Sequence, residues 1–297
     1  MILNVPETEL FAKGHRACAG CGAALAMRYI LKASGKNTIV AQATGCMEVI
    51  STPYPETAWR VPYIHVAFEN AAAVASGIDR ALRVLGKREE INVVAIGGDG
   101  GTFDIGLQAL SGALERGERF VYICYANEGY MNTGVQRSSD TPKYSSTTTS
   151  PAGKKIHGKV EFQKQMPFIA AAHGCYVATA NVAFPQDFIK KVQKALSIKG
   201  PSYVQVYTPC PPGWKIDDNM TIEISKLAFN AKITPLYEIE NGILTISKQP
   251  KDIPVKDYLK FQGRFRHLND SEIEEIQKYV NSEWERIKKL DETKVRI

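Results

Sequence analysis

The sequence predicts an α/β protein with a mostly parallel β-sheet and helices on both faces. Three observations lead to this prediction. Short apolar runs alternate with helical segments between residues 22 and 209, the run at 91–98 ends in a cluster of glycines, and other runs end in polar loop residues. The chain has 297 residues, of which 44% are hydrophobic, so it can bury a substantial core.

Local patterns assign the elements of the first half of the chain. A helix is expected where apolar residues recur with helical spacing and a glycine ends the segment, and a strand where a short apolar run is bounded by turn residues. In chain order we expect an exposed arm (1–11), a helix (23–34), a strand (38–44), a proline-rich loop or extended segment (51–65), a helix (70–86), a strand (91–98), a helix capped by Asp104 (105–117) and a strand (120–127).

The second half begins with a polar segment at 134–159, whose length is typical of a functional or disordered loop. The elements expected after it are a helix (160–174), a strand (175–180), a helix (185–200), a strand (202–209), a hairpin about Asn241-Gly242 (236–247) and a charged amphipathic helix (271–290). The change of character beyond Pro212 divides the chain into a main domain, 1–214, and a C-terminal extension, 215–297. This extension is expected to dock on a neighbouring chain or to wrap the domain.

Composition narrows the classes of partner. The net charge of +6 is modest and the basic residues are scattered, so no nucleic-acid partner is expected. No apolar run approaches the length of a membrane span, and the first residues lack the order of a secretory signal. We therefore expect a cytoplasmic protein with no membrane partner.

The six cysteines fall into two groups. Cys124 and Cys175 lie in apolar runs, where a cysteine acts as a small hydrophobic residue. Two more stand in GHRACAGCG (14–22), separated by two residues, and Cys46 and Cys210 follow apolar runs at expected strand ends. A Cys-x-x-Cys pair can be half of a zinc site, a redox dithiol or half of an iron–sulfur site, and the local spacing favours zinc.

The glycine cluster at 97–101 lies where a ligand of a parallel sheet binds, at the carboxyl end of a strand and before a helix. Its spacing matches neither of the common nucleotide-binding glycine motifs. Asn127 follows Asp99 by 28 positions, at the end of the next strand. Adjacent parallel strands would place these side chains together. A carboxylate, an amide oxygen and the carbonyl of Gly129 are suitable ligands for Mg²⁺.

The two segments IGGDGGTFDIGLQALSGALERG and YANEGYMNTGVQRS resemble the thiamine diphosphate motif and, in their fuller form, the β subunits of the 2-oxoacid:ferredoxin oxidoreductases. The resemblance runs from about Gly14 to Trp214 and is greatest to the members that act on pyruvate. It implies the thiamine diphosphate-binding fold and the conversion of pyruvate, coenzyme A and oxidised ferredoxin to acetyl-CoA, CO₂ and reduced ferredoxin. Members that act on oxalate, 2-oxoisovalerate or 2-oxoglutarate share these motifs.

The same resemblance implies the residues of the site. Mg²⁺ would be held by Asp99, Asn127 and the Gly129 carbonyl, and Asn132 would be the catalytic residue that faces the thiazolium and the substrate. A 4Fe-4S cluster would be held by Cys18, Cys21, Cys46 and Cys210. The neighbouring thiamine site favours this cluster over zinc, because its chemistry releases electrons that need an acceptor. Cofactor contacts are implied for Thr44, Gly45, Cys46, Gly98, Asp99, Gly100, Gly101, Thr102, Asn127, Gly129, Asn132 and Thr133.

Partners also follow from the resemblance. An α subunit would supply the pyrimidine-binding domain and the activating glutamate, and γ and ferredoxin-like δ subunits, or fused equivalents, would pass electrons to ferredoxin or flavodoxin. Glu48 is not taken as that glutamate. Because the segment around His65, Glu69 and Asn70 aligns only loosely with the family, no role is transferred to these residues, and His15 and His173 are expected to be structural. The alternatives are a thiamine enzyme without a cluster and a zinc-stapled scaffold without catalytic activity.

Overall fold

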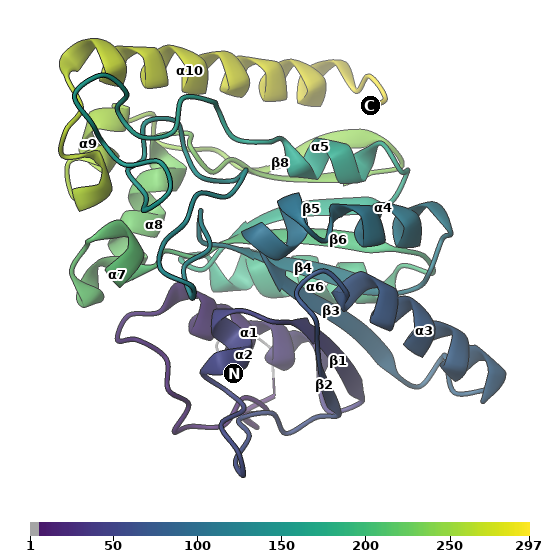
Figure 1. Cartoon of the computed structure of the whole chain (residues 1–297). Helices are drawn as coiled ribbons and strands as arrows, with labels where there is room; N and C mark the ends of the chain where they lie inside the picture. Colours follow the sequence, from purple (N-terminus) through teal and green to yellow (C-terminus); the bar gives the residue numbers. More distant parts are fainter. Residues whose placement is uncertain (1–5) are drawn as a thin grey trace.

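The computed structural model describes residues 6–297, and within them one eight-stranded sheet forms the centre of the molecule (Figure 1). The strand order is β2-β1-β3-β4-β6-β5-β7-β8. Strands β1 to β6 pair in parallel, whereas β7 and β8 are antiparallel to their neighbours, so the predicted mostly parallel sheet is confirmed. The strands are β1 (Thr38–Ala43), β2 (Tyr63–Val66), β3 (Asn92–Gly98), β4 (Val121–Ala126), β5 (Tyr176–Asn181), β6 (Ser202–Tyr207), β7 (Leu236–Glu240) and β8 (Ile243–Lys248).

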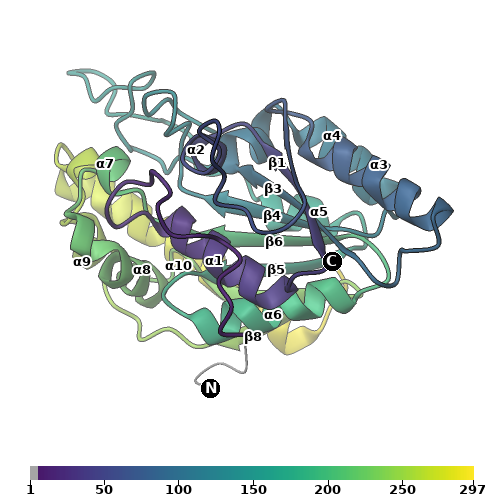
Figure 2. The same cartoon turned by 90° about the horizontal axis from the view of Figure 1, so that it is seen from below.

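Helices cover both faces of the sheet, as predicted. Helices α1 (Gly22–Ser34) and α6 (Pro185–Ser197) pack on one face and cross in front of the strands in Figure 2. Successive strand residues point to opposite faces, so Ile96 packs in this layer while Ala95 packs in the other. The opposite layer contains α3 (Ala71–Val84), α4 (Leu107–Glu115), α5 (Met166–Ala171) and α10 (Asp270–Thr293).

Seven further helical elements complete the described chain. They are α2 (Cys46–Val49), the π-helix η1 (Gly100–Asp104), α7 (Pro211–Trp214), the 3-10 helix η2 (Asp218–Met220), α8 (Thr221–Asn230), α9 (Val255–Leu259) and the 3-10 helix η3 (Gly263–Phe265). None of the helices between residues 6 and 297 combines the length and the apolar character that a membrane span requires.

The prediction that Asp104 caps the next helix is wrong. The chain is already helical before this residue, because η1 winds with a wider turn in which the Ile105 amide donates to the Gly100 carbonyl at 3.3 Å. Helix α4 then begins at Leu107 after Gly106, without a side-chain cap. The Asp104 carboxylate instead accepts hydrogen bonds from the Tyr130 hydroxyl and the Ser139 amide, both at 3.1 Å.

Two other segments depart from the sequence prediction. The helix expected over 160–174 is limited to Met166–Ala171, because Pro167 has no backbone N–H to donate and is tolerated only in the first turn of a helix. The expected N-terminal arm extends over residues 1–11, of which 1–5 lie outside the described residues. Phe11, at its end, is buried and packs edge-on against Trp59, with ring centroids 5.2 Å apart.

The C-terminal residues 215–297 complete the same sheet. The predicted hairpin about Asn241-Gly242 is confirmed as β7 and β8, and β7 pairs with β5. The predicted amphipathic helix is confirmed as α10, which buries Trp284 and Ile287 in the same layer as α4. A third apolar cluster joins α8, α9 and the start of α10 to Trp214. The domain boundary at residue 214 stays a prediction, and the hairpin of the extension is continuous with the sheet of the main domain.

The turn that contains Cys21 touches the end of β6. The Gly22 amide donates to the Pro209 carbonyl at 3.1 Å, and a Cβ at Gly22 would lie 2.9 Å from the Pro209 nitrogen and oxygen. No side chain fits at such a distance from backbone atoms. The contact therefore requires glycine and holds the N-terminal turn against the segment that leads into Cys210.

Gly22→Ala tests this contact. We expect the substitution to lower the free energy of unfolding by about 1–3 kcal/mol, because the new methyl group must push the two segments apart. The control is Gly77→Ala in α3, where an added Cβ meets no atom within 4 Å and should be neutral or stabilising by up to about 1 kcal/mol. Thermal unfolding midpoints of the two variants give the comparison, and equal midpoints would contradict the contact.

Candidate functional site

A cavity of about 120 Å³ opens at the carboxyl ends of β1, β3 and β4. Most residues of the implied cofactor site line it, namely Thr44, Gly45, Cys46, Gly98, Gly100, Gly101, Asn127, Gly129, Asn132 and Thr133. The lining also includes Phe68, Tyr125, Tyr130 and Met131, which sequence reasoning did not assign. Tyr125 and Tyr130 flank the Asn127–Gly129 motif, so their positions at a strand end were an available signal.

Aromatic rings determine where glycine is required around the cavity. A Cβ at Gly100 would lie 2.5 Å from the ring of Tyr130, and a Cβ at Gly45 would lie 2.7 Å from the hydroxyl of Tyr125. Both rings line the cavity, so the backbone passes directly beneath them. Glycine at these two positions therefore makes room for the tyrosine rings that form the cavity wall.

Three oxygen-bearing groups converge at this cavity, two in its lining (Asn127 and Gly129) and one buried behind it (Asp99). One terminal atom of the Asn127 side-chain amide lies 2.9 Å from Asp99 Oδ1 and 3.0 Å from the Gly129 carbonyl oxygen. With the amide nitrogen at this position, it donates to both oxygens; with the amide oxygen there, three oxygens face one another. Octahedral Mg²⁺ with Mg–O distances of about 2.1 Å places neighbouring ligands about 3.0 Å apart. The two separations from the Asn127 side chain therefore match the spacing between neighbouring ligands of Mg²⁺.

Asp99 is fully buried behind these groups. Burial raises the pKa of the Asp99 carboxyl to about 7. Hydrogen bonds donated by the Ser138 hydroxyl and by the backbone N–H of Asn127 oppose this rise. A buried carboxylate without a cation is costly, so the neutral acid persists to an unusually high pH. A divalent cation at this position would favour the charged form.

The other implied contacts occupy two kinds of position. Thr102 is fully buried and points into the sheet, where its hydroxyl donates to the Gly98 carbonyl at 2.7 Å. Asn132 and Thr133 lie at the exposed rim of the cavity. The Thr133 hydroxyl donates to the side chain of Gln136. The roles implied for Thr102, Asn132 and Thr133 stay predictions.

The four expected cluster cysteines gather beside this cavity. Cys46 lines the cavity, and burial together with the nearby thiols of Cys210, Cys21 and Cys18 raises its pKa to about 12. Burial also raises the pKa of Cys210 to about 12. Cys21 caps α1, where its sulfur accepts a hydrogen bond from the Ala24 amide at 3.4 Å. Cys21, Cys46 and Cys210 are half-buried and Cys18 is exposed, and a bound metal ion or cluster would convert these thiols to thiolates.

The spacing of these thiols bears on what they can hold. Among residues 6–297, no three His, Cys, Asp or Glu side chains come close enough together to bind one metal ion. A zinc ion needs its ligands within about 2.3 Å of a single point. An iron–sulfur cluster separates its cysteines by its own body, because each cysteine binds a different iron. The cluster implied at Cys18, Cys21, Cys46 and Cys210 stays a prediction.

A histidine outside the implied set also reaches the cavity wall. His65 Nε2 lies 2.7 Å from the Thr44 hydroxyl oxygen, and its Nδ1 lies 3.7 Å from the Glu48 carboxylate. Glu48 is held in turn by the Thr52 hydroxyl at 2.5 Å. The edge strand β2, which carries His65, was not predicted from the sequence, so nothing local indicated that this histidine would lie beside Thr44. Of the two histidines expected to be structural, His173 bonds to Ser111 and to the Ile169 carbonyl.

Comparisons with known proteins define the class. A family model described as "Thiamine pyrophosphate enzyme, C-terminal TPP binding domain" matches residues 43–206, which include β2 to β5, most of β6 and the residues that line the cavity. Pyruvate synthase subunit PorB of Methanocaldococcus jannaschii is 57% identical over 95% of this chain and 97% of the relative. The ketoisovalerate oxidoreductase subunit VorB of Pyrococcus abyssi is 48% identical over 98% and 96%.

The site and these matches define a thiamine-dependent enzyme subunit. The chain belongs to the β-subunit family of the 2-oxoacid:ferredoxin oxidoreductases, as its resemblance implied. A solved 2-oxoglutarate:ferredoxin oxidoreductase from Magnetococcus marinus superposes with a TM-score of 0.57 over 70% of both chains. Because the two sequences are only 21% identical, this likeness shows the fold alone.

The raised pKa of Asp99 predicts how cation binding depends on pH. Below a pKa of about 7 the carboxyl is neutral and above it is charged, so Mg²⁺ should bind more tightly as the pH rises from about 6 to 8. The measurement is the Mg²⁺ dissociation constant at a constant, saturating concentration of thiamine diphosphate.

Two variants separate Asp99 from the phosphates of the cofactor, which also titrate near pH 6. Asp99→Asn should bind Mg²⁺ weakly at every pH. Asp140→Asn, at a buried acid outside the implied ligand set, should keep the wild-type profile, because burial already raises the pKa of the Asp140 carboxyl well above its usual range. A wild-type profile in Asp99→Asn would show that Asp99 is not a ligand.

Proposed function

We propose that this chain is the β subunit of an enzyme that converts pyruvate and coenzyme A to acetyl-CoA and CO₂ and passes two electrons to ferredoxin. The observation that carries the proposal is the convergence of the polar groups of Asp99, Asn127 and Gly129 beside a glycine-lined cavity. The substrate is inferred from the pyruvate synthase subunits, which are up to 57% identical to this chain over almost all of its length.

The residues of the cavity would hold the diphosphate end of the cofactor. Asp99, Asn127 and the Gly129 carbonyl would bind Mg²⁺, which in turn would bind the phosphate oxygens. Backbone amides at Gly100 and Gly101, at the start of the η1 turn, would donate to the same oxygens. When bound, thiamine diphosphate supplies a nucleophilic carbon and an electron sink for decarboxylation. Asn132, at the rim, would face the reacting end of the cofactor.

The four cysteines would hold the electron outlet. Cys46 lines the cofactor cavity and also lies among the other three thiols, so a cluster there would adjoin the thiamine site directly. Electron transfer out of the cavity then needs no movement of the protein. The chain's task is to keep cofactor and cluster adjacent and to exclude water from between them.

The chain supplies half of the active site in this proposal. Its similarity to named subunits implies further subunits. An α subunit would contribute the glutamate that activates the thiamine pyrimidine, since Glu48 is engaged with Thr52 and His65. Ferredoxin-like clusters on other subunits would carry electrons to ferredoxin or flavodoxin, and coenzyme A would enter as the second substrate.

Turnover of a panel of 2-oxoacids by the purified complex tests the substrate assignment. With a viologen dye as acceptor, we expect pyruvate to have the highest kcat/KM, ahead of 2-oxoisovalerate, 2-oxoglutarate and oxalate. If another 2-oxoacid had a higher kcat/KM than pyruvate, that acid would be the substrate. No turnover of any acid by an intact, cofactor-loaded complex would refute the proposed activity.

Cys46→Ser tests the electron outlet. We expect the variant complex to lose iron and to lose dye reduction, because a serine hydroxyl is a poor ligand for iron, whereas thiamine diphosphate is retained. The control is Cys175→Ser, a buried cysteine whose thiol donates to the Ala170 carbonyl within the core. It should keep full iron content. Undiminished iron and dye reduction in Cys46→Ser would rule out the cluster role.

A further inference from the structure

The turn that connects the two implied metal-binding residues has an unusual backbone. Glu128 stands between Asn127 and Gly129 and has a φ of 67°. Residues with a side chain rarely adopt this left-handed conformation, and it persists only where the surroundings hold it. Both the direction of the Gly129 carbonyl and the position of the Asn127 amide depend on this residue. The contacts of Glu128 therefore decide whether the three oxygens face one another.

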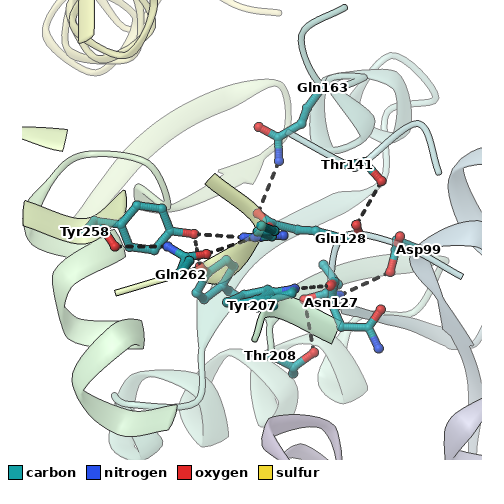
Figure 3. Close-up of polar contacts among 12 residues, drawn as sticks. Asp99, Asn127, Glu128, Thr141, Gln163, Tyr207, Thr208, Tyr258 and Gln262 are labelled. Carbon is teal, nitrogen blue, oxygen red and sulfur yellow. Dashed lines mark hydrogen bonds and ion pairs between the residues drawn. The ribbon is translucent and has the colours of Figure 1, made fainter. Parts of the chain in front are cut away.

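The Glu128 side chain is held by the C-terminal extension. Its carboxylate pairs with the Arg264 guanidinium, and only 2% of either side chain is exposed. A second, longer contact comes from the Gln163 amide at 3.4 Å. The Glu128 backbone carbonyl accepts from the Thr141 hydroxyl at 2.8 Å, as Figure 3 shows. Arg264 is 136 positions away along the chain and provides the cation for this buried carboxylate.

Arg264 is itself held in a fixed orientation. Its Nε donates to the Gln262 side chain at 2.9 Å, and its Nη2 lies 3.3 Å from the Tyr258 hydroxyl. Gln262 donates to the Tyr258 carbonyl, and the Tyr258 hydroxyl lies 2.7 Å from that of Tyr207 at the end of β6 (Figure 3). An arginine whose planar group is bonded at several points can direct a carboxylate, which a flexible ammonium group cannot.

The same extension also reaches the other side of the turn. The Arg264 guanidinium stacks on the Trp214 ring, 4.0 Å from its centroid. The Trp214 indole N–H donates to the backbone carbonyl of Asn127 at 2.8 Å. Arg264 thus contacts Glu128 directly and Asn127 through Trp214. One guanidinium therefore fixes two consecutive residues of the turn, Asn127 and Glu128.

We propose that Arg264 is a positioning residue for the cofactor site, and that the segment Tyr258–Arg264 of the extension locks the Asn127–Gly129 turn in the conformation that binds Mg²⁺ and diphosphate. This inference rests on the proposed function, since it assigns a task to the extension within that same site. A buried ion pair contributes little net stability when compared with apolar side chains, so directing the turn is a sufficient reason for its presence.

The experiment compares Arg264→Met with a matched buried pair far from the cavity. Asp79 is fully buried within α3 and pairs with both Arg83 and Arg88, so the control is the double variant Arg83→Met/Arg88→Met, which also leaves a buried carboxylate without its arginines. Each variant is made in the intact complex. Thermal midpoints of the cofactor-free complex and dissociation constants for thiamine diphosphate and Mg²⁺, by equilibrium dialysis, are measured for both.

Both variants should lower the thermal midpoint. Only Arg264→Met should also weaken Mg²⁺ and cofactor binding, by about 10–100-fold, which is the usual effect of removing a group that orients a metal ligand. Excess Mg²⁺ should restore cofactor binding in that variant. Arg264→Lys keeps the charge but not the planar guanidinium. This variant should bind Mg²⁺ and thiamine diphosphate more weakly than wild type and keep most of the thermal midpoint.

The double variant Arg264→Met/Glu128→Gln separates positioning from simple stability. Removing both charges should restore the thermal midpoint, because no buried charge is left unpaired, while cofactor binding stays weak. If the double variant recovered cofactor affinity together with the thermal midpoint, the positioning role would be overturned. An unchanged cofactor affinity in Arg264→Met would overturn it as well, and either result would leave the proposed function intact. A wild-type complex that binds no thiamine diphosphate would refute the proposed function and this inference with it.

Discussion

The parallel pairing of β3 with β4 is the constraint on which the site depends. Gly98 lies opposite Tyr125 in this pair, so the residues that follow the two strands meet at one edge of the sheet. As a direct result, the backbone N–H of Asn127 donates to Asp99 Oδ1 at 3.1 Å. The pairing of β4 with β6 extends the arrangement, since Ala126 lies opposite Tyr207 and Cys210 follows three residues later. Metal oxygens and a cluster cysteine thus share one edge.

Buried charge distinguishes this edge from the rest of the core. Asp99, Glu128 and Asp140 are each almost wholly buried, and Lys159 and Arg264 are buried among them. Burial and the neighbouring Asp99 raise the pKa of Asp140, while burial lowers the pKa of Lys159 to about 8. Such a group of acids is tolerated because part of it stays neutral and part is paired. A divalent cation at Asp99 would add the positive charge that the cluster lacks.

Sequence patterns were sufficient wherever the determining residues are close along the chain. The alternation of apolar runs and helices predicted the parallel sheet, Asn241-Gly242 predicted the hairpin, and the spacing of Asp99 and Asn127 predicted two adjacent strand ends. Failures came where tertiary contacts override local preference. Asp104 has the chemistry of a helix cap, but the wide turn at Gly100–Asp104 turns its carboxylate toward Tyr130 and Ser139.

The sequence by itself therefore determined most of the strands and long helices, the glycine cluster at the cavity and the family to which the chain belongs. Only the tertiary structure decided which distant groups act on the site. His65 reaches Thr44 because an unpredicted edge strand pairs with β1. Arg264 reaches Glu128 across 136 positions because the extension folds back over the end of the sheet. Contacts of this kind leave no local pattern, since packing and hydrogen bonding join residues by position in space and not along the chain.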